Sequence, residues 1–68
     1  MPIVRVTMAS GRTAQQKKAA ALAITDALVK HCDAHADHVY VVFDDIPADD
    51  WTVGGETITE RRRKRGEI

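Results

Sequence analysis

The first residues of the chain alternate between apolar and polar positions, as is typical of a β-strand. Between Pro2 and Met8, one face of such a strand carries only apolar side chains: Val4, Val6 and Met8. The opposite face carries Ile3, Arg5 and Thr7. We therefore predict a strand over Pro2–Met8 whose first face belongs to the hydrophobic core.

The pattern then changes to helical spacing. Thr13 with Gln16 three residues later is a capping-box signature, which predicts a helix from Thr13 to about Asp33. The segment is rich in alanine, a strong helix former. Its apolar stripe is expected from five residues: Ala20, Ile24, Ala27, Leu28 and Cys32. This stripe should pack the helix closely against a sheet.

A second strand is predicted over Val39–Phe43, a continuous apolar run of valines and aromatic residues. Such a run is typical of a strand that is buried on both faces. Strand, helix and strand at these lengths form a β-α-β unit with parallel strands and a right-handed crossover. Two strands under one helix do not form a stable fold alone, so we expect another subunit to cover the open face.

The last third of the chain begins with turn residues. Gly54-Gly55 between Thr52-Val53 and Glu56-Thr57 predicts a small hairpin. From Glu60 onward no periodic apolar face is present, and we expect a frayed end. The chain is thus predicted to be one α+β domain over residues 1–59, followed by a flexible basic tail over residues 60–68.

The small size of the chain requires an additional source of stability. A domain of 68 residues buries only about 60% of its unfolded surface. A single cysteine, Cys32, excludes an internal disulfide and fits a reducing compartment. No run of residues has the length of a membrane span or the layout of a signal peptide. We therefore expect a cytoplasmic oligomer without a membrane anchor.

Several histidines near the predicted helix end suggest a metal site. His31 and His35 are four residues apart, and Cys32 and His38 lie close by. A zinc site needs three or four converging ligands. Because the helix is expected to end near Asp33, His35 and His38 should point elsewhere. We predict no metal and no cofactor.

The basic tail is the candidate for a second kind of function. Residues 1–59 hold five basic and eight acidic side chains, whereas residues 60–68 hold five basic and two acidic ones. Such a run could contact phosphates, and an oligomer would multiply weak contacts. No aromatic residues for base stacking accompany it, which argues against nucleic-acid recognition.

The N-terminus offers the clearest chemistry. If Met1 is removed, Pro2 becomes a terminal secondary amine at the head of an apolar strand. An α-amine has a reference pKa of about 7.7–8.0, and desolvation or a nearby cation such as Arg12 lowers that value. A neutral amine there could act as a general base. With Met1 retained, the nitrogen is an amide, and Pro2 merely begins a strand.

These residues together resemble a known family, the tautomerase superfamily, and most closely its short 4-oxalocrotonate tautomerase branch. Four segments stand at the positions where this family has them: Met-Pro-Ile at the start, Gly11-Arg12-Thr13 entering the helix, the run Val39–Phe43 and the segment Trp51–Glu56. The match runs without gaps from Pro2 to about Glu56. The resemblance implies a β-α-β subunit, half of a ferredoxin-like fold, assembled as a homohexamer that is a trimer of dimers.

The resemblance also implies roles for individual residues. Pro2 matches the general base that moves a proton on an enol or unsaturated keto acid, and Arg12 matches the residue that binds a substrate carboxylate. Trp51 matches the hydrophobic wall of the site. Tyr40 stands where the well-studied enzymes carry a second arginine, and its hydroxyl brings no positive charge. A monoacid is therefore the expected substrate, with Arg5 or a tail arginine as candidates for the missing charge.

Two other functions remain open at this point. The same amine could activate water or add to an electrophile, as in dehalogenase and hydratase relatives that act on unsaturated acids. A chain that retains Met1 could instead be a catalytically silent oligomer that acts through its interfaces or its tail.

Overall fold

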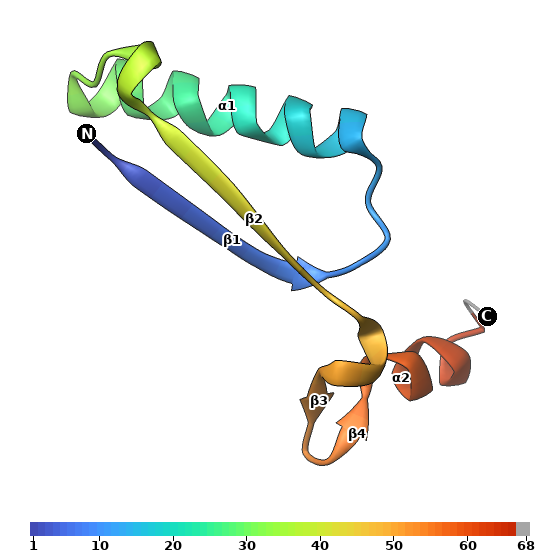
Figure 1. Ribbon diagram of the computed structural model, residues 1–68. Helices are drawn as coiled ribbons and strands as arrows, with labels where there is room; N and C mark the ends of the chain where they lie inside the picture. The colour runs from blue at the N-terminus through green and yellow to red at the C-terminus, as the bar shows by residue number, and fades with distance from the viewer. Residues whose placement is uncertain (67–68) are drawn as a thin grey trace.

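A computed structural model describes residues 1–66 of the chain, which form a β-α-β unit followed by a small C-terminal module (Figure 1). In chain order the elements are β1 (Ile3–Ala9), α1 (Ala14–Cys32), η1 (Ala36–His38), β2 (Tyr40–Ile46), η2 (Ala48–Asp50), β3 (Thr52–Val53), β4 (Glu56–Thr57) and α2 (Ile58–Lys64). The η elements are single turns of 3₁₀-helix. This order confirms the predicted α+β class and the β-α-β topology.

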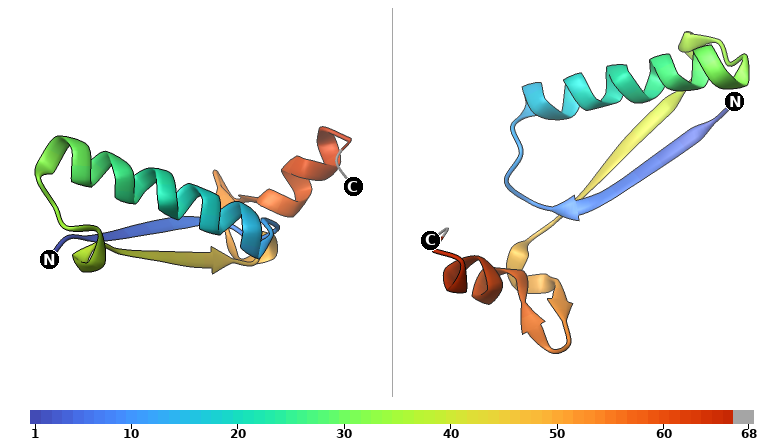
Figure 2. Two further views of the ribbon diagram at one scale, coloured as in Figure 1. Left: turned by 90° about the horizontal axis from the view of Figure 1, so that it is seen from above. Right: turned by 180° about the vertical axis from the view of Figure 1, so that it is seen from behind.

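β1 and β2 pair in parallel, and α1 lies across one face of the two strands (Figures 1 and 2). The register aligns Val4 with Val41 and Val6 with Phe43, and all four residues are half-buried on the helix side. This confirms the predicted core face of the first strand. In the described residues 1–66, no residue is fully buried, because one helix covers only one side of a narrow sheet.

The ends of α1 follow the predicted signals. The Thr13 hydroxyl accepts a hydrogen bond from the Gln16 backbone N–H at 3.1 Å, and the Thr13 N–H donates to the Gln16 side chain at 2.8 Å. At the other end, Asp33 adopts a left-handed conformation with φ of 55°. This C-cap explains why the helix stops at Cys32.

The predicted apolar stripe of α1 is only partly correct. Ile24 and Leu28 are half-buried, whereas three other residues of the stripe are exposed: Ala20, Ala27 and Cys32. The half-buried positions of α1 are instead Lys17, Ala21, Ile24, Thr25 and Leu28. The buried stripe of α1 is thus shifted from the predicted one, and Lys17 at its N-terminal end forms an ion pair with Asp45 of β2.

The face of the sheet that points away from α1 is open in the single chain, so burial of the second strand on both faces stays a prediction that depends on another subunit. Ile3 is 63% exposed, Tyr40 49% and Val42 38%. Farther along the same face, Arg5 pairs with Asp44 at 2.8 Å between Nη2 and Oδ1. The open face is thus apolar near the start of the strands and charged farther on.

β3 and β4 form the predicted hairpin at the opposite end of the sheet from the N-terminus (Figure 1). Gly54 and Gly55 connect the strands with φ angles of 61° and 84°. Two successive positive φ angles define the primed turn that suits a two-residue hairpin, and glycine adopts them without strain.

The prediction of a frayed end from Glu60 is wrong for residues 60–64, which belong to α2. Thr57 and Glu60 form a second capping box, in which the Thr57 hydroxyl accepts from the Glu60 N–H at 3.0 Å. Ion pairs from Glu56 to Arg61 and Lys64 stabilise the helix. Residues 67 and 68 of the predicted tail lie outside the described part of the chain.

Candidate active site

Pro2 and Tyr40 lie together at the end of the sheet where both strands begin. Ile3 is aligned with Tyr40, and the Pro2 carbonyl accepts a hydrogen bond from the Tyr40 backbone N–H at 3.0 Å. Pro2 is half-buried. The Tyr40 side chain belongs to the open face of the sheet, beside Ile3 and away from α1. The β pairing therefore fixes the direction of the chain at Pro2.

A cavity of about 560 Å³ borders this end of β1. Its walls include Met1 and Pro2 from the N-terminus, Leu28 from α1, and Ala34, His35 and His38 from the following segment. In the unprocessed chain the Pro2 nitrogen is the amide that joins it to Met1. Removal of Met1 would leave a terminal amine beside this cavity.

The histidines at this cavity do not converge on a common point with other ligands. His35 and His38 lie edge to face with ring centroids 5.6 Å apart, and Cys32 borders the same cavity, whereas His31 is exposed on α1 and is not one of its walls. Within residues 1–66 no group of three or more His, Cys, Asp or Glu side chains is placed to hold a metal ion. The described chain also has no helix long and apolar enough to cross a membrane.

Arg12 and Trp51 lie at the opposite end of the sheet, where both strands finish. Arg12 follows β1 and is exposed, and its Nη1 donates to the Ala9 carbonyl at 3.3 Å. Trp51 is half-buried at the end of η2, and its carbonyl accepts from the Ile58 N–H at 2.9 Å. This bond ties η2 to the start of α2.

The length of β1 separates the two pairs of predicted site residues. Eight steps of about 3.3 Å from Pro2 to Ser10 give about 26 Å. Within one chain, the structure therefore brings Pro2 next to Tyr40 but holds Arg12 and Trp51 far from both. A small substrate could meet all four only if a second copy presents its own Arg12 end to Pro2.

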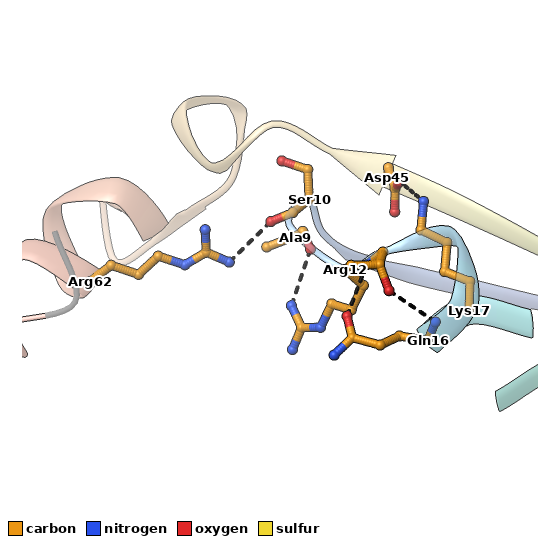
Figure 3. Close-up of polar contacts among 8 residues, drawn as sticks. Ala9, Ser10, Arg12, Gln16, Lys17, Asp45 and Arg62 are labelled. Atoms are coloured by element: carbon orange, nitrogen blue, oxygen red, sulfur yellow. Dashed lines mark hydrogen bonds and ion pairs between the residues drawn. The ribbon is translucent and has the colours of Figure 1, made fainter. Parts of the chain in front are cut away.

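A residue that the sequence does not single out also contacts the loop that carries Arg12. Arg62 of α2 donates from Nη2 to the Ser10 carbonyl at 3.3 Å, and it is half-buried (Figure 3). Because Arg62 stands in a run of basic residues, composition alone does not distinguish it from its neighbours. The capping box at Thr57 and Glu60 is the signal that could have placed it on a helix.

Thr57 also perturbs the acidity of Glu60. Hydrogen bonds from the Thr57 backbone N–H and hydroxyl to the carboxylate, at 3.1 Å and 3.0 Å, hold the pKa of Glu60 below its ordinary value. The cause is that both bonds favour the charged form. The Glu60 carboxylate thus belongs to the cap of α2.

Known proteins of the same size and fold match almost the whole chain. A family model described as tautomerase enzyme matches residues 2–61. A probable tautomerase of Ralstonia nicotianae is 43% identical over 60 residues, which cover 88% of this chain and 92% of that protein.

Solved structures agree with the sequence matches. A 4-oxalocrotonate tautomerase isozyme from Methylibium petroleiphilum superimposes with a TM-score of 0.84 at 32% identity and covers 93% of this chain and 98% of its own. A heterohexameric 4-oxalocrotonate tautomerase from Chloroflexus aurantiacus has a TM-score of 0.80 at 33% identity and covers 88% and 97%. The chain therefore belongs to the tautomerase family, and it is an isomerase with the β-α-β fold of the 4-oxalocrotonate tautomerases.

Proposed function

We propose that this tautomerase moves a proton between oxygen and carbon of an enol or unsaturated keto acid, with the amine of Pro2 as the general base after removal of Met1. The observation that carries the proposal is the position of Pro2, half-buried at the head of β1 and beside a cavity. Partial burial of Pro2 beside the apolar Leu28 and Ala34 favours the neutral form of an amine, which is the form that accepts a proton, whereas Asp33 at the same cavity favours the charged form that returns it.

The proton balance of this reaction needs no other reagent. The neutral Pro2 amine takes the proton from the enol hydroxyl, and the electron pair of that O–H bond forms the carbonyl. The double bond shifts, and the Pro2 ammonium returns the proton to carbon at the third or fifth position. The amine is neutral again after each cycle, and no cofactor takes part.

The remaining site residues come from a neighbouring subunit in this proposal. The separation of about 26 Å along β1 excludes contact between Pro2 and Arg12 of the same chain. The open apolar face of the sheet supports assembly, and the relative from Chloroflexus aurantiacus is a heterohexamer. We propose a homohexamer in which a neighbour supplies Arg12 to bind the substrate carboxylate and Trp51 to wall the site.

The Tyr40 backbone is bonded to Pro2, and its side chain reaches the same end of the sheet from the open face, outside the walls of the cavity. Its hydroxyl can donate one hydrogen bond to a developing enolate oxygen but supplies no positive charge. Charge-assisted hydrogen bonds are about twice as strong as neutral ones. We therefore propose a monocarboxylate enol, such as an arylpyruvate, as the substrate class rather than a dicarboxylate.

The location of the protein belongs to the same proposal. Cys32 is an exposed free thiol, and such cysteines persist in reducing compartments. We propose that the enzyme acts in the cytoplasm on a small soluble acid.

A proline substitution tests the assigned base. Pro2→Ala should lower kcat/KM for ketonisation of the enol of phenylpyruvate, because a flexible primary amine replaces the fixed ring nitrogen. A positioned general base accelerates a reaction about 10²–10⁴-fold, so the loss of kcat/KM should not exceed this range. Pro47→Ala, at the other proline of the chain, is the matched control and should retain activity. Full activity of Pro2→Ala would exclude Pro2 as the base.

A further inference from the structure

Arg62 differs from the other basic residues of its run. The segment Arg61–Arg65 is basic throughout, but only Arg62 is half-buried while its neighbours are exposed. Its guanidinium reaches back over 52 residues of sequence to the Ser10 carbonyl, at 3.3 Å from Nη2. Arg62 therefore lies at the loop between β1 and α1 rather than at the free side of α2.

Arg12 lies at the same loop. Its Nη1 donates to the carbonyl of Ala9, and Arg62 donates to the carbonyl of the next residue, Ser10, each at 3.3 Å. Consecutive Cα atoms are about 3.8 Å apart, so the two guanidinium groups bond to adjacent peptide units. Figure 3 shows Arg12 from the loop and Arg62 from α2 directed to these two residues. Two positive charges are thus bound to neighbouring residues of one turn.

Neither of these two arginines has an anionic partner in residues 1–66. Four of the other cations in the described residues pair with carboxylates: Arg5, Lys17, Arg61 and Lys64. Arg12 and Arg62 contact only backbone carbonyls, through single bonds near the long limit for an N–H···O bond. Each guanidinium has five N–H donors in a planar fork, so donors remain for a carboxylate.

The charge missing at Tyr40 makes this pair relevant to the substrate. Arg5 is the other cation considered for that role, but Asp44 already binds both its Nε and its Nη2, at 3.3 Å and 2.8 Å. We infer that Arg62 and Arg12 together form a two-arginine site for one substrate carboxylate, with Arg62 as a substrate-binding residue. This inference rests on the proposed function, since Arg12 brings Arg62 with it to the site of a neighbour.

A purely structural role for Arg62 makes a different prediction. If Arg62 only ties α2 to the loop, its removal affects acids and neutral ligands alike. If it binds a carboxylate, only ligands with a negative charge lose affinity. A pair of ligands of the same shape, one charged and one neutral, therefore separates the two roles.

The test compares Arg62→Gln with Arg63→Gln, an exposed neighbour on the same helix that loses the same charge. The substrates are the enol of phenylpyruvate and the enol of its methyl ester. A hydrogen-bonded charge contributes roughly tenfold or more, so Arg62→Gln should lower kcat/KM for the acid about tenfold, mainly through KM. The ester should change less than twofold, and Arg63→Gln should resemble the unmodified enzyme with both substrates.

A binding measurement keeps the test independent of proton transfer. Calorimetric titration with 3-phenylpropionate, which has no enol form, should give a Kd about tenfold higher for Arg62→Gln and unchanged for Arg63→Gln. Titration with 3-phenylpropanol should not distinguish the variants. This result supports the two-arginine site even if Pro2 proves not to be the base, whereas equal Kd values for the two variants would overturn it even if turnover depends on Pro2.

A third variant covers the case in which Arg62→Gln does not fold. Arg62→Lys keeps the charge and the long side chain but loses the planar fork. It should raise the Kd of 3-phenylpropionate about threefold with an unchanged circular dichroism spectrum. A Kd equal to that of the unmodified protein contradicts the inference.

Discussion

Replacing Ile3 with aspartate should dissociate the proposed homohexamer, because the single chain is more open than a stable domain of its size and Ile3 lies on its exposed apolar face. A compact domain of 68 residues has a radius of gyration of about 11 Å, from the usual dependence on length. The observed radius is 15.2 Å, and the chain extends over 43 × 22 × 16 Å. A compact protein of this mass exposes about 4,200 Å², by the usual dependence on mass. This chain exposes 5149 Å².

Ile3 is the most exposed apolar residue on the open sheet face, at 63%. Full burial of an isoleucine side chain contributes about 1.5–3 kcal/mol, so covering the exposed part in an oligomer contributes about 1–2 kcal/mol per subunit. Ile3→Asp removes this contribution. It also buries a carboxylate without a partner, which costs several kcal/mol more or forces the subunits apart.

Sedimentation velocity and thermal unfolding measure the two consequences. The unmodified protein should sediment as an oligomer, and its Tm should rise with protein concentration because assembly and folding are linked. Ile3→Asp should sediment as a smaller species with a lower Tm. Ala19→Asp adds the same charge at an exposed position of α1 and serves as the control. An Ile3→Asp protein with unchanged assembly and Tm would refute the idea that another subunit covers this face.

Two further predictions concern α2 and the end of the sheet where Pro2 and Tyr40 lie. Hydrogen bonds from Thr57 lower the pKa of Glu60 in the folded chain. The stabilisation of α2 by this cap is therefore complete above the ordinary pKa of glutamate, and it is lost as the pH falls through the lowered pKa. Carbon-detected NMR should give a titration midpoint for Glu60 below that of a free glutamate. Glu60→Gln can still cap the helix and should remove the pH dependence of its stability. A titration midpoint at or above the ordinary value contradicts this prediction. Tyr40→Phe should lower kcat for the enol of phenylpyruvate about fivefold, as expected for the loss of one neutral hydrogen bond, with unchanged sedimentation. An unchanged kcat assigns Tyr40 to packing alone.

The parts of the fold that depend on local signals were predictable. The alternation in β1, the capping box at Thr13 and the Gly54-Gly55 turn each specify structure within a few residues, and all three are confirmed. The shift of the buried stripe of α1 was not predictable, because it depends on contacts with β2 that are distant in sequence, such as that of Lys17 with Asp45 across 28 residues.

α2 shows how composition can hide a local signal. Thr57 and Glu60 repeat the capping pattern of the first helix, but the basic run after them indicated a frayed end. Similarly, an apolar strand such as β2 indicates burial without saying whether its own chain or another one provides the cover. Val42 is exposed here because residues 1–66 place no second layer on that side of the sheet.

The resemblance to the family identified the residues of the proposed site. The direction of the strands determines where these residues lie. Pro2 precedes β1 and Arg12 follows it, so the strand itself separates them. Arg62 could not be assigned from sequence, since its contact with Ser10 depends on how the hairpin and α2 fold back toward the loop. Long-range contacts of this kind require the structure.

The most direct test of Pro2 as the base uses one preparation of protein before and after treatment with methionine aminopeptidase. Intact mass reports whether Met1 is present, and ketonisation of the enol of phenylpyruvate is measured on the same samples. We predict that protein retaining Met1 is inactive and that activity rises in proportion to the fraction lacking Met1. Equal turnover by chains with and without Met1 would contradict the assignment of Pro2 as the base.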